Sequence, residues 1–345
     1  MNRRQFITQS FTLFLAGLFA PAKLLSASSA SNSSTFCLAF GSCADQNIGQ
    51  PIWGAIARSS PDLFAFLGDN IYADTEDMNV MQEKYEQLAR IPDFASFRKK
   101  IPIVATWDDH DFGLNDVGAD YSQKNTSKKL FLDFFREPKN SVRRLQKGIY
   151  TSYFFGAEKQ RTQLILLDLR WFRSALVQGP NGEYLPNPDR NATLLGEEQW
   201  KWLEEQLKKP ADFRILGSSV QFASSDHRWE KWANFPREKS RLLKMLDRLA
   251  VRNLLVISGD MHFGEISRDS TPAGYPLYDF TSSGLNYAEP STDPNGKRLA
   301  LFDTGPNFGL VTVDWTATPP SVSMELRDEL GATKIRKKFL LPSRQ

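Results

Sequence analysis

The chain has 345 residues, with 43 basic and 40 acidic side chains and a formal net charge of +3. So small a basic excess argues against a nucleic-acid scaffold role, because binding through phosphate contacts requires a strongly basic surface. The length fits one large domain or two ordinary ones and is sufficient for a deep core.

The first 30 residues have the pattern of a secretory signal. Arg3 and Arg4 form a charged pair, an apolar stretch runs from Phe11 to Ala20, and small residues follow. The paired arginines suggest the twin-arginine export route. An uncleaved anchor is the alternative, but the apolar stretch is shorter than the roughly 20 residues that a membrane span requires.

We therefore expect residues 1–30 to be a twin-arginine-type signal peptide and residues 31–345 to form a single domain. Loss of the signal removes three of the 43 basic residues and no acid, so the mature chain is formally neutral. It is expected to be bacterial and exported, either periplasmic or extracellular. The export machinery is its implied protein partner, and no stable membrane insertion is expected after cleavage.

Short apolar runs and amphipathic stretches alternate along the chain, which predicts buried strands and surface helices. In chain order we expect strand 36–40, helix 51–60, strand 63–67, strand 101–106, helix 122–136, strand 163–167, helix 197–207, strand 213–216, helix 237–251, strand 253–257 and then strands 278–282, 309–315 and 321–326. This order predicts an α/β protein with two stacked sheets and helices outside them.

The segment 174–195 is rich in Gly, Pro and Asn and has no periodicity. A loop of this length without regular structure is uncommon and often borders a site. It is equally compatible with a simple surface excursion.

The two cysteines, Cys37 and Cys43, are a possible disulfide in an exported protein. Cys37 lies inside a predicted strand and Cys43 just past its end. Unless the chain reverses after Gly41, an extended segment separates them beyond disulfide reach, so we expect two free thiols.

Four polar clusters follow predicted strands, at the position where α/β sheets place ligand sites. Taken alone, Asp69 has an ordinary explanation as a helix cap or turn residue. The run from Asp108 to Asp111 is harder to explain, because three carboxylates around one imidazole repel one another unless a cation, several donors or water compensates. The clusters are segments 40–43, 67–72, 107–111 and 258–262.

Local spacing also brings residues together within two of these clusters. Asp260 and His262 point the same way if their segment is extended, and one helical turn would bring Asp69 and Tyr72 together. The four clusters together provide donors for at least two metal ions. Two ions about 3.5–4 Å apart can generate a hydroxide and clamp both oxygens of an in-line displacement at phosphorus.

The order of these motifs resembles that of the calcineurin-like metallophosphoesterases, and their detailed form is similar to the alkaline phosphatase D (PhoD-like) family. The resemblance extends over roughly residues 36–285. It implies a four-layer αββα sandwich of two mixed β-sheets flanked by helices. It is carried by segments 40–43, 67–72, 107–111, 115–116, 167–170, 195–200, 229–232 and 259–262.

The chain departs from the wider superfamily in its ligand set. Cys43 stands in the region of the usual Asp-x-His, and Asp260 replaces the first histidine of Gly-His-x-His. The resemblance implies Fe3+ held by Cys43, Asp69 and Tyr72 beside Ca2+ held largely by carboxylates. Thiolate and phenolate suit ferric iron, and oxygen ligands suit calcium. A pair of other divalent ions such as Zn2+ or Mn2+ is the alternative.

Within this scheme Asp69 is expected to bridge the metals, and His262 or Asp260 also lies near the iron. Asp109 and Asp260 are expected on the calcium side. Gln221, at another strand end, is a candidate carbonyl ligand, although polar residues there could simply end the strand.

The two expected catalytic residues are Asp69 and His110. His110 stands where the superfamily has its proton donor, and general acid catalysis is worth about 10²–10⁴-fold. Its alternative is a metal ligand or a structural hydrogen-bonding residue. Arg170 is a candidate for the substrate phosphate, since a guanidinium donates bidentately; a salt bridge with Asp168 or a neighbour is the alternative. His227 is expected to be a satisfied surface or loop histidine.

The family resemblance implies an alkaline phosphatase/phosphodiesterase-type hydrolase that acts on phosphate esters. The substrates would be phosphodiesters, phosphomonoesters or both, attacked in line by a metal-bound hydroxide. One alternative is a phospholipase or nucleotidase specialised by segment 174–195. Another is a non-catalytic exported protein that uses the ions structurally, which the complete set of candidate ligands disfavours.

Overall fold

The computed structural model describes residues 34–341, which fall in one compact unit. The predicted signal, residues 1–30, lies outside the described residues and stays a prediction. Between residues 34 and 341, no helix has the length and apolar character needed to cross a membrane.

Strand β2 (Leu63–Leu67) reveals how the layers are arranged, because all five of its residues are buried. Phe64 and Phe66 pack in one hydrophobic core, whereas Leu63, Ala65 and Leu67 pack in another. Successive side chains of a strand point to opposite faces. A strand that is apolar at every position is therefore covered on both sides, here by helices on one face and by a second sheet on the other.

The first sheet is mixed and has six strands in the order β15-β14-β13-β1-β2-β3. Strands β1, β2 and β3 are parallel, and the remaining pairings are antiparallel. Besides β2, its strands are β1 (Thr35–Gly41), β3 (Ile103–Thr106), β13 (Asn307–Asp314), β14 (Ser321–Asp328) and β15 (Thr333–Leu340).

The second sheet is also mixed and has seven strands in the order β12-β10-β11-β9-β8-β5-β4. Its central strands β5, β8, β9 and β11 are parallel. Its strands are β4 (Thr151–Phe155), β5 (Thr162–Leu166), β8 (Phe213–Gly217), β9 (Leu254–Ser258), β10 (Gly264–Ser270), β11 (Pro276–Ser282) and β12 (Arg298–Phe302).

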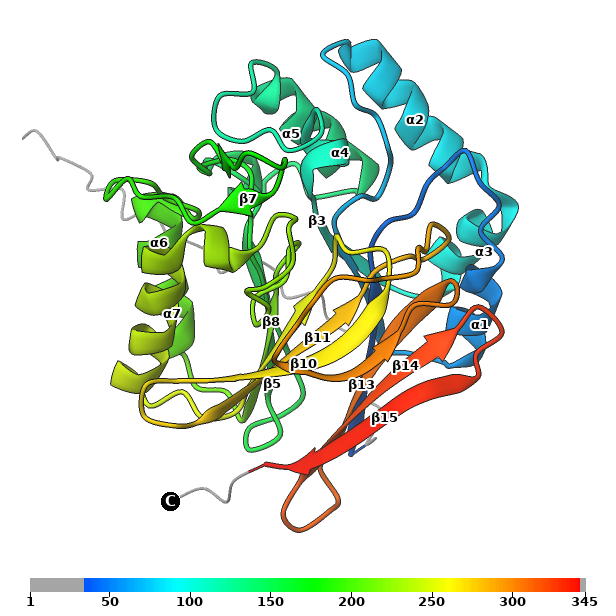
Figure 1. The fold of residues 1–345 in the computed structure, drawn as a ribbon. Helices are drawn as coiled ribbons and strands as arrows, with labels where there is room; N and C mark the ends of the chain where they lie inside the picture. Colours follow the sequence, from blue (N-terminus) through cyan, green and yellow to red (C-terminus); the bar gives the residue numbers. More distant parts are fainter. Residues whose placement is uncertain (1–33, 342–345) are drawn as a thin grey trace, which may run out of the picture. The chain divides into compact units, whose positions relative to one another are not determined.

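Helices cover the two outer faces, with α6 and α7 on the second sheet and most of the others on the first (Figure 1). The predicted four-layer αββα sandwich is confirmed. The helices are α1 (Ile52–Arg58), α2 (Met78–Arg90), α3 (Pro92–Lys100), α4 (Asp109–Phe112), α5 (Lys124–Phe134), α6 (Gly196–Lys208) and α7 (Pro236–Arg248), with short 3-10 turns η1 (Val142–Arg144) and η2 (Trp232–Asn234).

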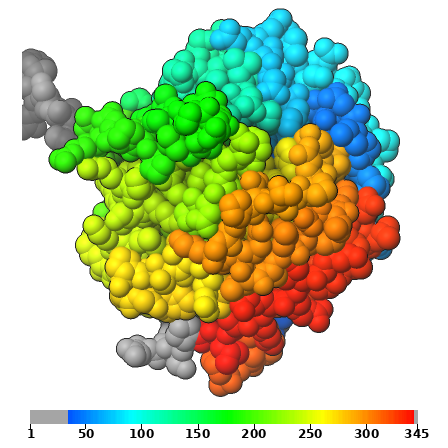
Figure 2. Space-filling model, in the orientation of Figure 1, coloured from blue at the N-terminus to red at the C-terminus, as the bar shows by residue number. Residues whose placement is uncertain are grey.

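The segment 174–195 is more ordered than the sequence predicts. It contains a small hairpin of β6 (Val177–Gln178) and β7 (Tyr184–Leu185). In the space-filling view this part of the chain projects from the surface as a green lobe (Figure 2).

Candidate metal centre

The four polar clusters of the sequence come together at the carboxyl ends of β1, β2, β3 and β9. Their ligand atoms form three groups, and within each group the atoms lie within 4.8 Å of one another. Asp69 belongs to all three, so it lies at the centre of the arrangement. The groups are Cys43 with Asp69 and His262, Asp69 with Asp109 and His110, and Asp69 with Asp108 and Asp260.

The backbone is left-handed at four of these positions, with φ values of 58° at Cys43, 49° at Asp69, 73° at Asp260 and 58° at His262. Such conformations cost non-glycine residues of the order of 1–3 kcal/mol each and are concentrated at functional sites. The segment from Asp260 to His262 is therefore not extended, and its two side chains belong to different ligand groups, contrary to the sequence prediction.

The loop after β2 is not a helical turn either. Gly68 has a φ of 107°, and a Cβ at this position would lie 2.4 Å from the Cβ of Asp108. Only glycine permits both the backbone angle and this close approach. The loop that carries Asp69 is thereby packed directly against the one that carries Asp108.

Asp111 serves the backbone rather than the cluster. Its carboxylate accepts hydrogen bonds from the N–H groups of Asp69 (3.2 Å), Asn70 (3.4 Å) and Asp108 (2.8 Å), and from the Asn70 side chain (2.5 Å). Burial nevertheless raises the pKa of Asp111 to about 8. Of the three carboxylates around His110, the structure thus assigns this one to holding two loops together.

Three other buried carboxylates each have one oxygen that accepts a hydrogen bond from the protein and one that has no hydrogen-bond partner. A buried polar atom without a partner costs about 1–3 kcal/mol, and more if it is charged. The bound oxygens are Asp69 Oδ2, 3.3 Å from Cys43 Sγ, Asp108 Oδ1, 2.7 Å from Arg170 Nε, and Asp109 Oδ2, 2.7 Å from the backbone nitrogen of Asp116. The unpartnered oxygens are Asp69 Oδ1, Asp108 Oδ2 and Asp109 Oδ1.

The basic groups of the protein stabilise the negative charge of some carboxylates in this cluster but not of others. Burial raises the pKa of Asp69 well above its usual range, and the neighbouring Cys43 and Asp109 raise it further. Burial and nearby carboxylates do the same to Asp260. At Asp109, Arg170 and His110 outweigh the effect of burial and lower the pKa to about 2. Keeping Asp69 and Asp260 ionised therefore costs free energy, which a bound cation would offset.

A sulfur and a phenol lie on the His262 side of Asp69. Cys43 is fully buried, with its Sγ 3.1 Å from Ser283 Oγ, and burial raises the pKa of the thiol to about 11. The hydroxyl of Tyr72 lies 3.3 Å from His262 Nε2. Cys37 and Cys43 are both free, as the strand geometry predicts.

His110 is paired with Asp74, a residue that the sequence reasoning missed. Its Nδ1 lies 2.8 Å from both carboxylate oxygens of Asp74. Burial opposes a charge on His110, but the hydrogen bond with Asp74 and the carboxylates of Asp69 and Asp109 outweigh it and raise the pKa to about 11. Asp74 is only two residues beyond Tyr72, so its place beside a cluster was the signal that could have identified it.

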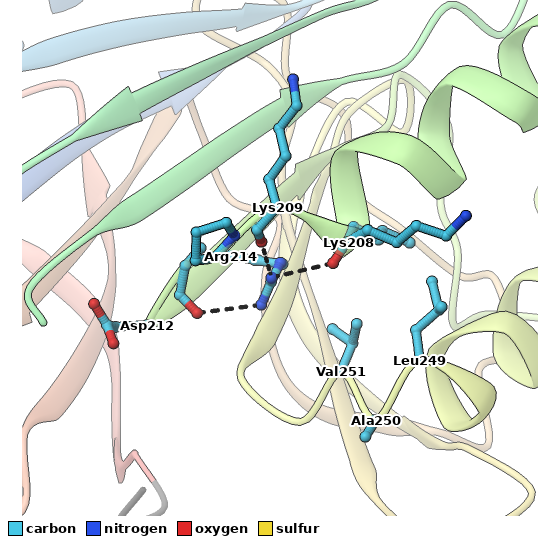
Figure 3. Close-up of a pocket in the computed structure, with 10 residues that line it drawn as sticks. Lys208, Lys209, Asp212, Arg214, Leu249, Ala250 and Val251 are labelled. Carbon is cyan, nitrogen blue, oxygen red and sulfur yellow. Dashed lines mark hydrogen bonds between the residues drawn. The ribbon is translucent and has the colours of Figure 1, made fainter. Parts of the chain in front are cut away.

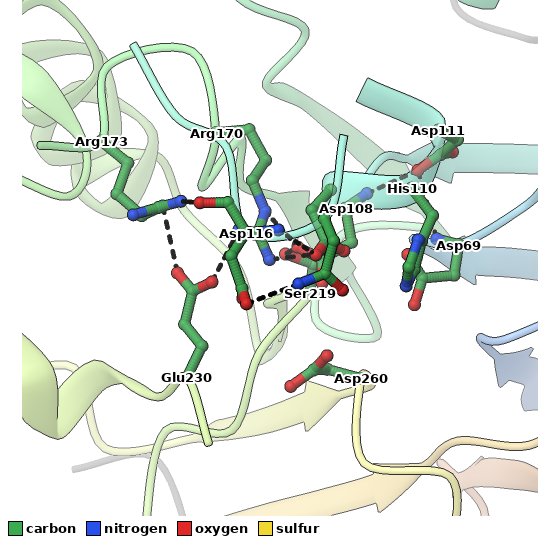
Figure 4. A network of polar contacts seen from close by, with 12 residues as sticks. Asp69, Asp108, His110, Asp111, Asp116, Arg170, Arg173, Ser219, Glu230 and Asp260 are labelled. Carbon is green, nitrogen blue, oxygen red and sulfur yellow. Dashed lines mark hydrogen bonds and ion pairs between the residues drawn. The ribbon is translucent and has the colours of Figure 1, made fainter. Parts of the chain in front are cut away.

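Arg170 is held inside the protein by ion pairs with carboxylates. The residue is fully buried, and its guanidinium lies 2.7 Å from Asp108, 2.6 Å from Glu230 and 3.8 Å from Asp109 (Figure 4). Three carboxylates surround it, which favours the alternative of an ion pair with a neighbour. The contact with substrate phosphate stays a prediction.

A known protein family matches the part of the chain that carries these ligand groups. Residues 38–294 match the family model of the PhoD-like phosphatases. The chain belongs to the PhoD-like phosphatase family. The matched region includes every ligand group described above, so the predicted resemblance to the PhoD-like family is confirmed.

Two relatives agree with this assignment. The PhoD-like chain is 24% identical over 269 residues to alkaline phosphatase D of Bacillus subtilis (strain 168). The aligned segment covers 65% of this chain and 45% of the relative. It thus spans less than half the length of that relative. The solved structure of PhoD superposes with a TM-score of 0.71 at 16% identity, over 89% of this chain and 70% of the other.

A dimetal phosphatase from Danio rerio shares the fold more distantly. Its TM-score is 0.50 at 12% identity, over 89% of this chain and 99% of the other. The clustered ligand groups of this PhoD-like chain are thus carried on a scaffold that it shares with a phosphatase described as binding two metals.

Gln221 lies in another polar cluster of the PhoD-like chain. Its buried amide nitrogen donates to Glu265 Oε1 at 2.7 Å and to Thr281 Oγ1 at 2.9 Å. The side chain therefore links the segment after β8 to strands β10 and β11. A role as a metal ligand gains no support from these contacts.

His227 lies in a loop, as the prediction of a surface or loop histidine allows, but it is neither exposed nor hydrogen-bonded. It is only 3% exposed, and neither ring nitrogen has a hydrogen-bond partner. Burial, together with the nearby Lys231, lowers the pKa of His227 to about 3. The imidazole is thus packed as a neutral ring.

A separate hollow, drawn in Figure 3, lies beside the amino-terminal ends of β8 and β9. Lys208, Lys209 and Arg214 line it. The guanidinium of Arg214 donates to the carbonyls of Leu207 (3.2 Å) and Lys209 (2.7 Å), so it satisfies the carboxyl end of α6. The guanidinium of Arg214 therefore caps the carboxyl end of the helix and does not point to a ligand.

Proposed function

We propose that this PhoD-like chain is an exported, metal-dependent phosphoesterase that hydrolyses phosphodiesters, phosphomonoesters or both. The observation that carries the proposal is the set of three buried carboxylates, Asp69, Asp108 and Asp109, each with one oxygen that accepts no hydrogen bond. Family membership supports the phosphatase chemistry. The signal-like residues 1–30 support export.

The donor set fits two unlike metal ions on either side of Asp69. Cys43, Tyr72 and His262 would complete a ferric site, because sulfur, phenol and imidazole suit iron. The carboxylates of Asp109 and Asp260, joined by Asp108, would hold calcium. When bound, a metal pair activates water as a nucleophile and offsets the charge that develops at phosphorus.

Metal analysis of the purified mature protein is the test of this assignment. We expect iron and calcium in stoichiometric amounts, with a broad visible absorption band from thiolate or phenolate bound to iron. Cys43→Ser should weaken or shift that band, and Cys37→Ser, the matched control, should leave it unchanged. Zinc or manganese without colour would contradict the iron assignment, and a protein without any stoichiometric metal would overturn the enzyme proposal.

His110 is the proposed proton donor to the leaving group. Asp74 holds Nδ1 at 2.8 Å, which fixes the ring and leaves Nε2 as the nitrogen that can exchange a proton. Asp69 and Asp109 lie in the same ligand group as His110, so the ring is next to the site of hydrolysis.

Replacement of His110 by glutamine is expected to lower kcat by about 10²–10⁴-fold on esters with poor leaving groups. An ester of 4-nitrophenol, which leaves readily without a proton, should lose far less. Asp74→Asn should show the same dependence on the leaving group with a smaller loss. Equal losses on both kinds of ester would exclude the proton-donor role and favour a role in holding metal.

A further inference from the structure

A closed ring of polar contacts adjoins the candidate metal centre, and Figure 4 shows its members Arg170, Glu230, Arg173 and Asp116. Arg170 Nη1 lies 2.6 Å from Glu230 Oε2, and Arg173 Nε lies 3.1 Å from Glu230 Oε1. Arg173 donates to the carbonyl of Asp116, whose N–H donates to Asp109 Oδ2 at 2.7 Å. Arg170 closes the ring at 3.8 Å from Asp109 Oδ1. The ring therefore begins and ends on one carboxylate of the centre.

Asp116 is the residue of this ring that reaches the surface of the protein. Its backbone is left-handed, with a φ of 57°, which is the conformation that turns its N–H toward Asp109. Its own carboxylate accepts hydrogen bonds from Tyr184 Oη at 2.5 Å and from the Asn115 amide at 2.7 Å. Asp116 is thus fixed through its N–H, its carbonyl and its side chain.

Tyr184 belongs to strand β7, in the hairpin that stands out from the surface. Its N–H donates to the carbonyl of Arg228 at 2.8 Å, and its carbonyl accepts from the Asn234 amide at 2.8 Å. These contacts fasten the hairpin to the segment that carries Glu230. The hairpin and the buried ring are therefore joined both through Tyr184 and through residues 228–234.

We propose that Tyr184 and Asp116 are positioning residues that fix the carboxylate of Asp109 for the calcium side of the centre. The inference rests on the proposed function, since it takes Asp109 as a metal ligand. Because the Asp116 N–H holds Oδ2, Oδ1 is the oxygen presented to an ion. Residues that orient metal ligands typically contribute 10–100-fold to metal affinity. The hairpin thus acts on the centre without touching it.

Calcium titration by calorimetry tests this role. The protein is dialysed against EGTA to remove calcium, and the visible band is recorded before and after dialysis to verify that iron stays bound. Tyr184→Phe, which loses only the hydroxyl, is expected to raise the Kd for calcium about tenfold. The visible band of the Cys43 and Tyr72 side and the melting temperature in EGTA should stay unchanged. Tyr278→Phe, a tyrosine of strand β11, is the matched control and should bind calcium as the parent does.

Asp116→Asn provides a second variant, because it keeps the backbone N–H while weakening the acceptor for Tyr184; the same loss, smaller in size, is expected. An unchanged calcium Kd in both variants would overturn the positioning role. So would a parallel loss of the visible band, which would mean that the whole centre had collapsed. If the parent protein itself takes up no calcium, the proposed metal assignment fails, and the inference fails with it.

Discussion

Replacement of Asp69 by asparagine should eliminate stoichiometric metal and lower phosphoesterase activity by at least about 10³-fold. Asp69 is the residue common to all three ligand groups, so its loss affects both sides of the centre. Metal ions contribute several kcal/mol to charge stabilisation in the transition state, and each 1.36 kcal/mol corresponds to a factor of ten in rate. Steady-state kinetics and metal analysis on the same preparation measure the effect.

The same variant should unfold at a higher temperature than the parent when a chelator is present. Burial and the neighbouring Cys43 and Asp109 raise the pKa of Asp69 well above its usual range, so its charge destabilises the fold at neutral pH. An amide of the same shape removes that charge. Added metal should raise the melting temperature of the parent but not of Asp69→Asn.

Asp120→Asn, at an exposed position, is the matched control and should change neither property. Activity within tenfold of the parent in Asp69→Asn would refute the central position of this carboxylate. A lower melting temperature in chelator would instead show that Asp69 stabilises the fold through contacts of its own.

Replacement of Arg170 by methionine should destabilise the protein by about 3–5 kcal/mol, because it leaves buried carboxylates without their cation. Asp108 and Glu230 each lie within 2.7 Å of the guanidinium, and all three side chains are at most 3% exposed. Denaturant unfolding with an unchanged m value measures the loss as a change in stability. The result separates this role from a phosphate contact, which would raise KM and leave stability intact.

Two further variants make the test of Arg170 specific. Arg170→Lys keeps the charge but loses the planar fork, so its loss of stability should be intermediate. Arg190→Met, at an exposed position, should stay within about 0.5 kcal/mol of the parent. A loss below about 1 kcal/mol in Arg170→Met would mean that water or a rearranged partner compensates the carboxylates.

The core strands were predictable because buried strands such as β2 and β9 consist almost entirely of continuous apolar residues. Helix α2 was missed although its buried residues Met81, Tyr85 and Leu88 have helical spacing, since polar residues outnumber them. Strand β15 alternates between exposed and half-buried residues and carries several basic ones. Its assignment as a strand depends on pairing with β14, and the local sequence pattern does not predict that pairing.

The position of the candidate metal centre was predictable for a related reason, since parallel strands bring their carboxyl ends together. The sequence did not predict which of its carboxylates bind backbone groups and which remain available for a metal. Asp108, Asp109 and Asp111 lie on one turn, yet Asp111 is taken up by N–H groups from a loop about 40 residues earlier. Likewise, Arg170 meets Glu230 at a sequence separation of 60. Which oxygen remains for a metal depends on such distant donors.

The left-handed backbone at Cys43, Asp69, Asp260 and His262 has a consequence for anyone who engineers this chain. Glycine would relieve the conformational strain at each position. Selection for thermal stability alone would therefore favour substitutions at these four positions. The resulting variants would be more stable but would lack the candidate metal ligands. Thermostabilisation should hold them constant and look for improvement in the helical outer layers.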